Sequence, residues 1–232
     1  FEQINGPGHR VTFTDISDVI AEFIAFEWRA DNSPFDQYLR NGNTLPKAAH
    51  LGMELFYGKA QCSGCHAGQF QTDHNFHAIA LPQIGPGKSA RFETHARDEG
   101  RLRVTGNPAD AYKFRTPSLR NVAQTAPYGH NGTYGTLKAI IRHHLDPVAS
   151  LKAYDVTQLV LPNLPNSQDF RATRDPYQQA AIAAANELPP SDMSETEITQ
   201  IVAFLNALSD TASLSGQLGV PRSVPSGLPV DQ

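Results

Sequence analysis

The chain has 232 residues, a formal net charge of −4 at pH 7 and 40% hydrophobic residues. This length is enough to bury the core of one or two domains. The mild negative charge argues against a nucleic-acid-binding protein, and no stretch reaches the roughly 18–20 unbroken apolar residues of a membrane-spanning helix. Two cysteines are too few for a disulfide scaffold. Because the chain starts at Phe1 without a signal-peptide pattern, we expect a mature form or a piece of a longer polypeptide.

Apolar residues at helical spacing predict a first helix that begins with Thr14 or Asp15 as its cap. Trp28, near the end of this helix, is expected to pack in the core. A second helix is predicted over residues 45–57, directly before the two cysteines. Residues 68–135 are poor in periodicity and rich in Gly, Pro, Asn and Asp, which is typical of a functional loop region.

Three more helices are predicted toward the C-terminus. The first covers residues 136–145 and is stopped by Pro147, and the second covers residues 176–187. The last begins with a capping box formed by Ser194 and Glu197, followed by an apolar face at helical spacing. The sequence therefore predicts a mainly α fold with long ordered loops and a short two-stranded hairpin.

The strongest chemical signal is the run Cys62-Ser63-Gly64-Cys65-His66. Two thiols at this spacing can add to the two vinyl groups of a haem, and the adjacent histidine then coordinates the iron from one face. A zinc site would need a second pair of ligands, and there is no further cysteine. A thioredoxin-like redox pair would need a βαβ context, which the pattern lacks. The motif thus predicts one covalent haem c with His66 as the proximal ligand.

The sequence identifies the ligand on the far side of the iron less directly. Met53 and Met193 are poorly placed, and methionine is usually a core gap-filler. His143 and His144 close a short helix after the loop region, so either could supply a ligand. A buried haem also carries two propionates, which suit arginine side chains. The candidates for such a contact are Arg101, Arg103, Arg115 and Arg120.

These residues, together with several ordered segments, resemble the C-terminal haem domain of bacterial di-haem cytochrome c peroxidases and, more closely, of their MauG-like relatives. The matching segments are residues 33–39, 52–56, 72–77, 81–82, 98–101, 114–121, 125–132 and 224–230. The resemblance implies a c-type cytochrome-like haem domain over residues 46–232. A linking helix and lead-in segment would occupy residues 1–45.

In that family the helix after the Pro-Tyr-x-His segment presents the distal iron ligand, which is Met in peroxidases and Tyr in MauG-like members. The matching residue here is His144, which departs from both patterns. The resemblance thus implies that His66 and His144 hold the iron. It also implies a calcium ion that takes backbone oxygens from Thr125 and Pro127. We expect a second haem-bearing domain or chain to supply the haem of the family's N-terminal domain.

The function expected from this resemblance is the electron-relay half of a periplasmic peroxidase-type oxidoreductase that acts on hydrogen peroxide. A small electron-donor cytochrome or cupredoxin would be its partner. The alternative is a mono-haem electron carrier without peroxidase activity. In a third hypothesis the lone haem reacts with peroxide itself, with His77 or His130 as the acid–base group.

Overall fold

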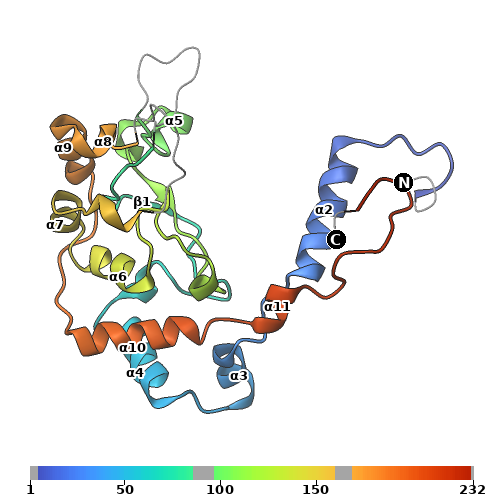
Figure 1. Ribbon diagram of the computed structural model, residues 1–232, viewed down its shortest axis with the longest axis horizontal. Helices are drawn as coiled ribbons and strands as arrows, with labels where there is room; N and C mark the ends of the chain where they lie inside the picture. The colour runs from blue at the N-terminus through green and yellow to red at the C-terminus, as the bar shows by residue number, and fades with distance from the viewer. Residues whose placement is uncertain (1–4, 86–96, 160–168, 231–232) are drawn as a thin grey trace. The chain divides into compact units, whose positions relative to one another are not determined.

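The computed structural model describes residues 5–85, 97–159 and 169–230 (Figure 1). By its internal contacts the chain divides into two compact units. The first unit contains residues 1–43 and 210–232, and the second contains residues 44–209. The C-terminal residues therefore belong with the N-terminal ones, a grouping that the linear sequence does not reveal.

The second unit is a helical domain in which short turns and loops separate the helices. In chain order its elements are α4 (Lys47–Tyr57), η1 (Cys62–Gly64), β1 (Phe76–His77), α5 (Leu102–Thr105), η2 (Pro108–Asp110), β2 (Phe114–Arg115), η3 (Val122–Gln124), α6 (Leu137–Leu145), α7 (Pro147–Lys152), η4 (Val156–Gln158), α8 (Arg171–Arg174), α9 (Pro176–Ala184) and α10 (Glu195–Asn206). This arrangement confirms the predicted mainly α fold.

Helices α4 and α10 cross and pack against each other at one end of the second unit (Figure 1). Phe56 from α4 and Phe204 from α10 are almost fully buried, and their ring centroids lie 5.1 Å apart. The helices approach so closely at Gly52 that a Cβ there would overlap the backbone carbonyl of Gln200. The crossing therefore requires glycine at this position, and it fixes the helix that leads into the cysteine motif.

Most predicted helices of the second unit are present, with shifted ends. The capping box of α10 is confirmed, because Ser194 and Glu197 bond each other's backbone N–H groups. Pro147 follows the end of α6, as predicted, and also occupies the first turn of α7. The predicted two-stranded hairpin is an antiparallel pair of two-residue strands, β1 and β2, joined by a long connection rather than a tight turn.

The first unit contains α2 (Phe13–Glu27), α3 (Pro34–Asn41) and α11 (Thr211–Ser215). Thr12 caps α2 and Asp15 completes its capping box, so the predicted cap at Thr14 or Asp15 is wrong by two or three residues. Trp28 was expected in the core but is 51% exposed, with only an edge contact to Phe23 at 5.6 Å. A wide apolar face of α2 is similarly exposed, formed by Phe13, Ile16, Val19, Ile20, Phe23, Ile24 and Phe26.

Two buried carboxylates hold the segments of the first unit together. Glu27, at the end of α2, accepts hydrogen bonds from the backbone N–H groups of Leu218 at 2.6 Å and Gly219 at 3.0 Å. Asp210 accepts from the N–H groups of Asp31 at 3.1 Å and Asn32 at 2.9 Å. The C-terminal tail consequently lies against α2 (Figure 1). Across the described residues, no helix combines the length and apolar character needed to cross a membrane.

Candidate haem-binding site

The cysteine motif lies on a single tight turn that follows α4. After a left-handed residue at Gln61, the chain enters η1, and the N–H groups of Cys65 and His66 both bond the carbonyl oxygen of Cys62. The two thiols are free and partly buried, one turn apart. Burial raises the pKa of Cys62 to about 11 and also raises that of Cys65. Both sulfurs are therefore held as neutral thiols at the spacing that haem attachment requires.

His66 is oriented by the backbone of the loop that follows it. Its Nδ1 atom lies 3.2 Å from the carbonyl oxygen of Gln71. A carbonyl only accepts, so Nδ1 carries the proton and Nε2 keeps its lone pair. Burial, followed by the charge of His144, lowers the pKa of His66 to about 4. His66 is therefore a neutral imidazole with Nε2 available to a metal, and the backbone fixes its tautomer.

His144 has the same arrangement on α6. Its Nδ1 atom lies 2.8 Å from the carbonyl oxygen of Ile140, one turn earlier in the helix. Burial lowers the pKa of His144, which keeps the ring neutral and leaves the Nε2 lone pair unused by this bond. A positive charge on His144 would lower the pKa of His66, so the two rings influence each other electrostatically. That both histidines bind one iron stays a prediction.

The two predicted arginines lie beside the loop after His66 but make different contacts. Arg120 donates from Nε to the carbonyl oxygen of Gln69 at 2.8 Å, so it braces that loop. Arg115 is exposed, and its Nη1 atom donates to the carbonyl oxygen of Thr116. A propionate contact by either arginine stays a prediction.

The residues predicted to hold calcium lie on an ordered turn. Thr125 follows η3 and donates from its hydroxyl to the carbonyl oxygen of Val122. The next peptide bond, between Ala126 and Pro127, is cis. These observations fix the shape of the turn, and calcium binding stays a prediction.

One polar cluster near the motif was not predicted as a unit. Nε2 of His77 lies 2.8 Å from a carboxylate oxygen of Asp73, and ligand atoms of Cys65, Asp73 and His77 all lie within 4.8 Å of one another. In the described part of the chain this is the one such group of three potential metal ligands. The spacing of Asp73 and His77 is the only sequence signal that could have indicated it. If Cys65 formed a thioether with a haem, Asp73 and His77 would remain as a polar pair beside the attachment point.

His130 is engaged elsewhere. Its Nε2 atom lies 2.8 Å from the carboxylate of Asp98, and Phe114 stacks on its ring with centroids 3.7 Å apart. Asp73 engages His77 in a similar way. Both histidines proposed as acid–base groups therefore have carboxylate partners, and an acid–base role for either stays a prediction.

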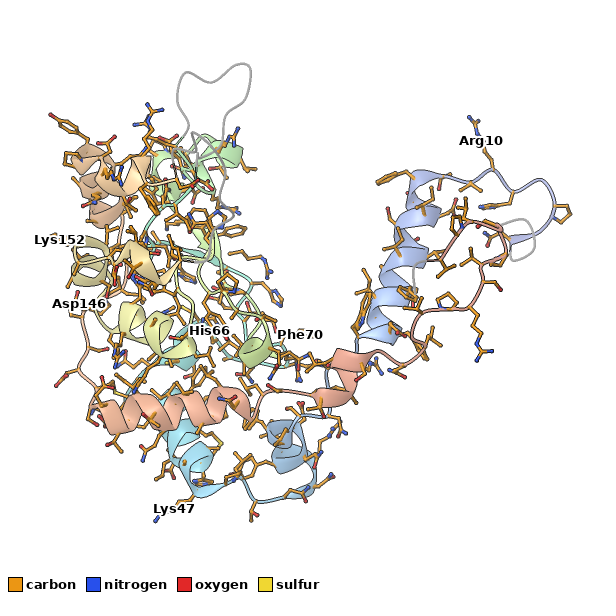
Figure 2. All side chains as sticks on the ribbon, in the orientation of Figure 1. Arg10, Lys47, His66, Phe70, Asp146 and Lys152 are labelled. Atoms are coloured by element: carbon orange, nitrogen blue, oxygen red, sulfur yellow. The ribbon has the colours of Figure 1, made fainter. Side chains whose placement is uncertain are left out.

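The donor set fits a covalent haem. Two neutral thiols stand one turn apart and are followed directly by His66, whose Nδ1 atom is tied to a backbone carbonyl. His144 on α6 has its Nδ1 atom tied to a carbonyl in the same way. A haem attached here would be held by Cys62, Cys65 and His66, and its iron could be closed from the other side by His144. Beside this site, the exposed ring of Phe70 marks the loop surface next to His66 (Figure 2).

The chain is similar to known haem peroxidases and to MauG. No family model matches the sequence. The chain is 32% identical over 205 residues to a cytochrome-c peroxidase of Denitromonas iodatirespirans, covering 80% of this chain and 46% of that protein. It is 34% identical over 180 residues to the methylamine utilization protein MauG of Methylorubrum extorquens, covering 76% of this chain and 39% of that protein.

A solved structure shares the fold. A MauG-like protein associated with microbial copper homeostasis superposes with a TM-score of 0.56 and 27% identity, covering 79% of this chain and 53% of that one. The chain therefore spans about half the length of the relatives it matches.

Proposed function

Because this chain belongs to the family of bacterial di-haem cytochrome c peroxidases and MauG-like proteins, we propose that it is the electron-relay half of a peroxidase-type oxidoreductase that acts on hydrogen peroxide. It would carry one haem c, attached through Cys62 and Cys65. When bound, this haem supplies a site that stores and passes single electrons. The protein supplies the ligands and encloses them.

The observation that carries the proposal is the pair of neutral, partly buried histidines whose Nδ1 atoms are tied to backbone carbonyls. Two such imidazoles would both bind the iron of a haem held here and would leave peroxide no place to coordinate. A closed iron suits electron transfer, because neither ligand has to leave when the electron arrives. Peroxide would then react at a second haem, on another domain or chain.

The exposed face of α2 supports a partner of this kind. Seven large apolar side chains of this helix are exposed, with fractions from 43% for Ile16 to 85% for Phe13. Isolated apolar residues are common on protein surfaces, but a contiguous face along one helix is typical of an interaction site. We propose that the second haem-bearing domain covers this face.

The compartment, electron donor and calcium site belong to the same proposal. We propose a periplasmic location. The periplasm is oxidising, so a free pair of thiols would tend to form a disulfide there, and thioether bonds to a haem would protect Cys62 and Cys65 from this oxidation. A small cytochrome or cupredoxin would deliver electrons near the exposed Phe70, 51% of which is accessible. Calcium would bind the backbone oxygens of Thr125 and Pro127.

Low-temperature EPR of the oxidised holoprotein, with haem counted per chain, tests the assignment. We expect one haem and a single low-spin ferric signal of bis-histidine type. Replacing the distal ligand in His144→Met should raise the reduction potential on the order of 0.1 V, within the roughly 0.8 V range that axial ligands span. The matched variant His50→Met alters a histidine on the outer surface of α4 and should leave both measurements unchanged.

The spectrum also separates the competing functions. A high-spin ferric signal in the unmodified protein would contradict the relay assignment and make this haem itself the peroxide site. A low-spin signal in a protein that never associates with a second haem domain would favour the mono-haem electron carrier. The same closed site serves either of the two electron-transfer functions.

A further inference from the structure

Two buried hydrogen bonds join the residue before His144 to neighbouring segments, and they form a line from Tyr134 through His143 to Ile79. His143 is fully buried, and its Nδ1 atom lies 2.7 Å from the hydroxyl oxygen of Tyr134. Its Nε2 atom lies 2.6 Å from the carbonyl oxygen of Ile79. The imidazole of His143 therefore connects α6 with two other parts of the same unit, the turn before α6 and the segment that continues β1.

The chemistry of these three partners permits a single arrangement of protons. The Ile79 carbonyl can only accept, so Nε2 of His143 must carry the proton. Nδ1 is then an acceptor, and the hydroxyl of Tyr134 donates to it. With a neutral imidazole, each of the two hydrogen bonds then contains one proton, and both partners on the line are satisfied. Every polar atom on this line has a partner, as a buried site requires.

The two ends of the line are themselves fixed. Tyr134 exchanges both backbone hydrogen bonds with Tyr128, at 2.7 and 3.1 Å, and its ring packs against Tyr154 at 5.6 Å. On the other side, Ala78 precedes Ile79, is fully buried and pairs with the backbone and side chain of Glu187. His143 thus spans two anchored segments rather than two mobile loops.

His144 has no comparable anchor outside its own helix among the described contacts. Its Nδ1 atom bonds Ile140, which is also part of α6, so this bond moves with the helix. The rings of His143 and His144 stand nearly perpendicular, at 89°, with centroids 6.1 Å apart. Any rotation or shift of α6 would therefore redirect Nε2 of His144, and the bonds of His143 are what oppose such a movement.

We propose that Tyr134 and His143 form a lock that positions His144 on the haem iron. Both are positioning residues, since neither contacts the iron itself. The inference rests on the proposed function, because it requires His144 to be the distal ligand. The lock adds a new element to that function: the hydroxyl of Tyr134 sets how strongly His144 binds the iron.

Cyanide binding to the ferric holoprotein measures this strength, because cyanide must displace His144 to reach the iron. In Tyr134→Phe the aromatic ring stays and only the hydroxyl is lost, so Nδ1 of His143 has no donor. We expect cyanide affinity to rise about tenfold, the change in an equilibrium constant that accompanies the loss of one buried hydrogen bond. His143→Gln, which keeps the donor to Ile79 but loses the acceptor for Tyr134, should give a similar increase.

Tyr154→Phe is the matched control. It removes a hydroxyl that donates to the Thr133 carbonyl beside the same Tyr134 ring, but it leaves the line through His143 intact. Its cyanide affinity should stay within about twofold of the unmodified protein. The low-spin EPR signal, recorded for each variant without cyanide, shows whether the geometry of the iron ligands has changed.

The outcomes separate this inference from the function on which it rests. Equal affinities in Tyr134→Phe and Tyr154→Phe, with a low-spin unmodified protein, would overturn the lock while His144 remained the ligand. A high-spin unmodified protein that binds cyanide freely would overturn both. If Tyr134→Phe fails to fold with haem, His143→Gln decides, and unchanged affinity there would reject the lock.

Discussion

The two compact units are stabilised in different ways. In the second unit the core is apolar and closed, with Phe56, Ile201 and Phe204 each no more than 2% exposed. Among the described residues of the first unit, Phe35 is the single buried large apolar side chain. The other buried residues there are polar, namely Glu27, Ser33, Asp36, Asp210 and Ser213.

This difference indicates different tasks. Apolar burial is the main stabilising contribution in folding, and the second unit obtains it from its own helices. The first unit keeps its shape through carboxylates that accept backbone hydrogen bonds, while its largest apolar surface, on α2, stays exposed. We infer that the second unit is a haem domain stabilised by its own core. We also infer that the first unit presents the apolar face of α2 for binding to another protein surface.

The largest expected effect comes from the α4–α10 crossing. In Gly52→Ala the added methyl group would meet the backbone of Gln200, so the helices must separate or shift. Overpacking of this kind should lower the free energy of unfolding of the holoprotein by about 3 kcal/mol, the upper end of the usual range. Denaturant unfolding followed at the haem absorbance measures it.

Gly64→Ala is the control for this substitution. A Cβ at Gly64 has no neighbour within 4 Å, so the cost should stay below about 1 kcal/mol. Equal losses in the two variants would show that the crossing is not the tight point of the second unit.

A smaller, local effect is expected in the first unit. In Glu27→Gln one of the two acceptor oxygens becomes an NH₂ group that faces backbone N–H donors of the tail. Hydrogen exchange at Leu218 and Gly219 should become several-fold faster, while exchange in α10 stays unchanged. Glu22→Gln alters an exposed carboxylate on the same helix and should change neither. Slower or unaltered exchange at the tail in Glu27→Gln would contradict the role of this carboxylate.

The same bonds predict how the tail responds to pH. The N–H donor of Leu218, with those of Gly219 and Gln217, lowers the pKa of Glu27 below its usual value near 4.5. A lowered carboxyl pKa adds stability that is fully present above the unfolded pKa and is lost as the pH falls through the folded one. The protection of the tail amides, measured relative to intrinsic exchange at the same pH, should therefore fall below about pH 4.5 in the unmodified protein, and Glu27→Gln should lack this fall.

The smallest effect on stability is expected on the apolar face of α2. Ile20 is 53% exposed, so Ile20→Asp should change the free energy of unfolding by no more than about 0.5 kcal/mol. It should nevertheless reduce the fluorescence of a dye that binds exposed apolar surfaces. Ala21→Asp, on the opposite side of the helix, should leave the dye signal unchanged. A large loss of stability in Ile20→Asp would mean that the face is already covered.

The sequence predicts the second unit better than the first. Helices such as α10 carry their own signals, a capping box and an apolar face, so local rules were sufficient. Trp28 was misplaced because an apolar pattern identifies a face without saying what covers it. The motif itself identifies Cys62, Cys65 and His66, whereas His144 needed a family resemblance.

Other features of the site depend on contacts between distant residues. The line from Tyr134 through His143 to Ile79 joins positions that no periodicity relates. The same holds for Glu27, which meets a tail almost two hundred positions later. Such pairings appear only once the backbone brings the partners together.

The late position of α10 in the chain has a consequence for biosynthesis. The helix that leads into Cys62 packs on residues 195–206, which leave the ribosome long after the two cysteines. A growing polypeptide thus presents both thiols before the fold that buries them can form. During this interval the sulfurs lack the enclosure that raises their pKa, and their thiolate forms are more accessible. The order of the helices would therefore leave time for the proposed haem attachment before the domain closes.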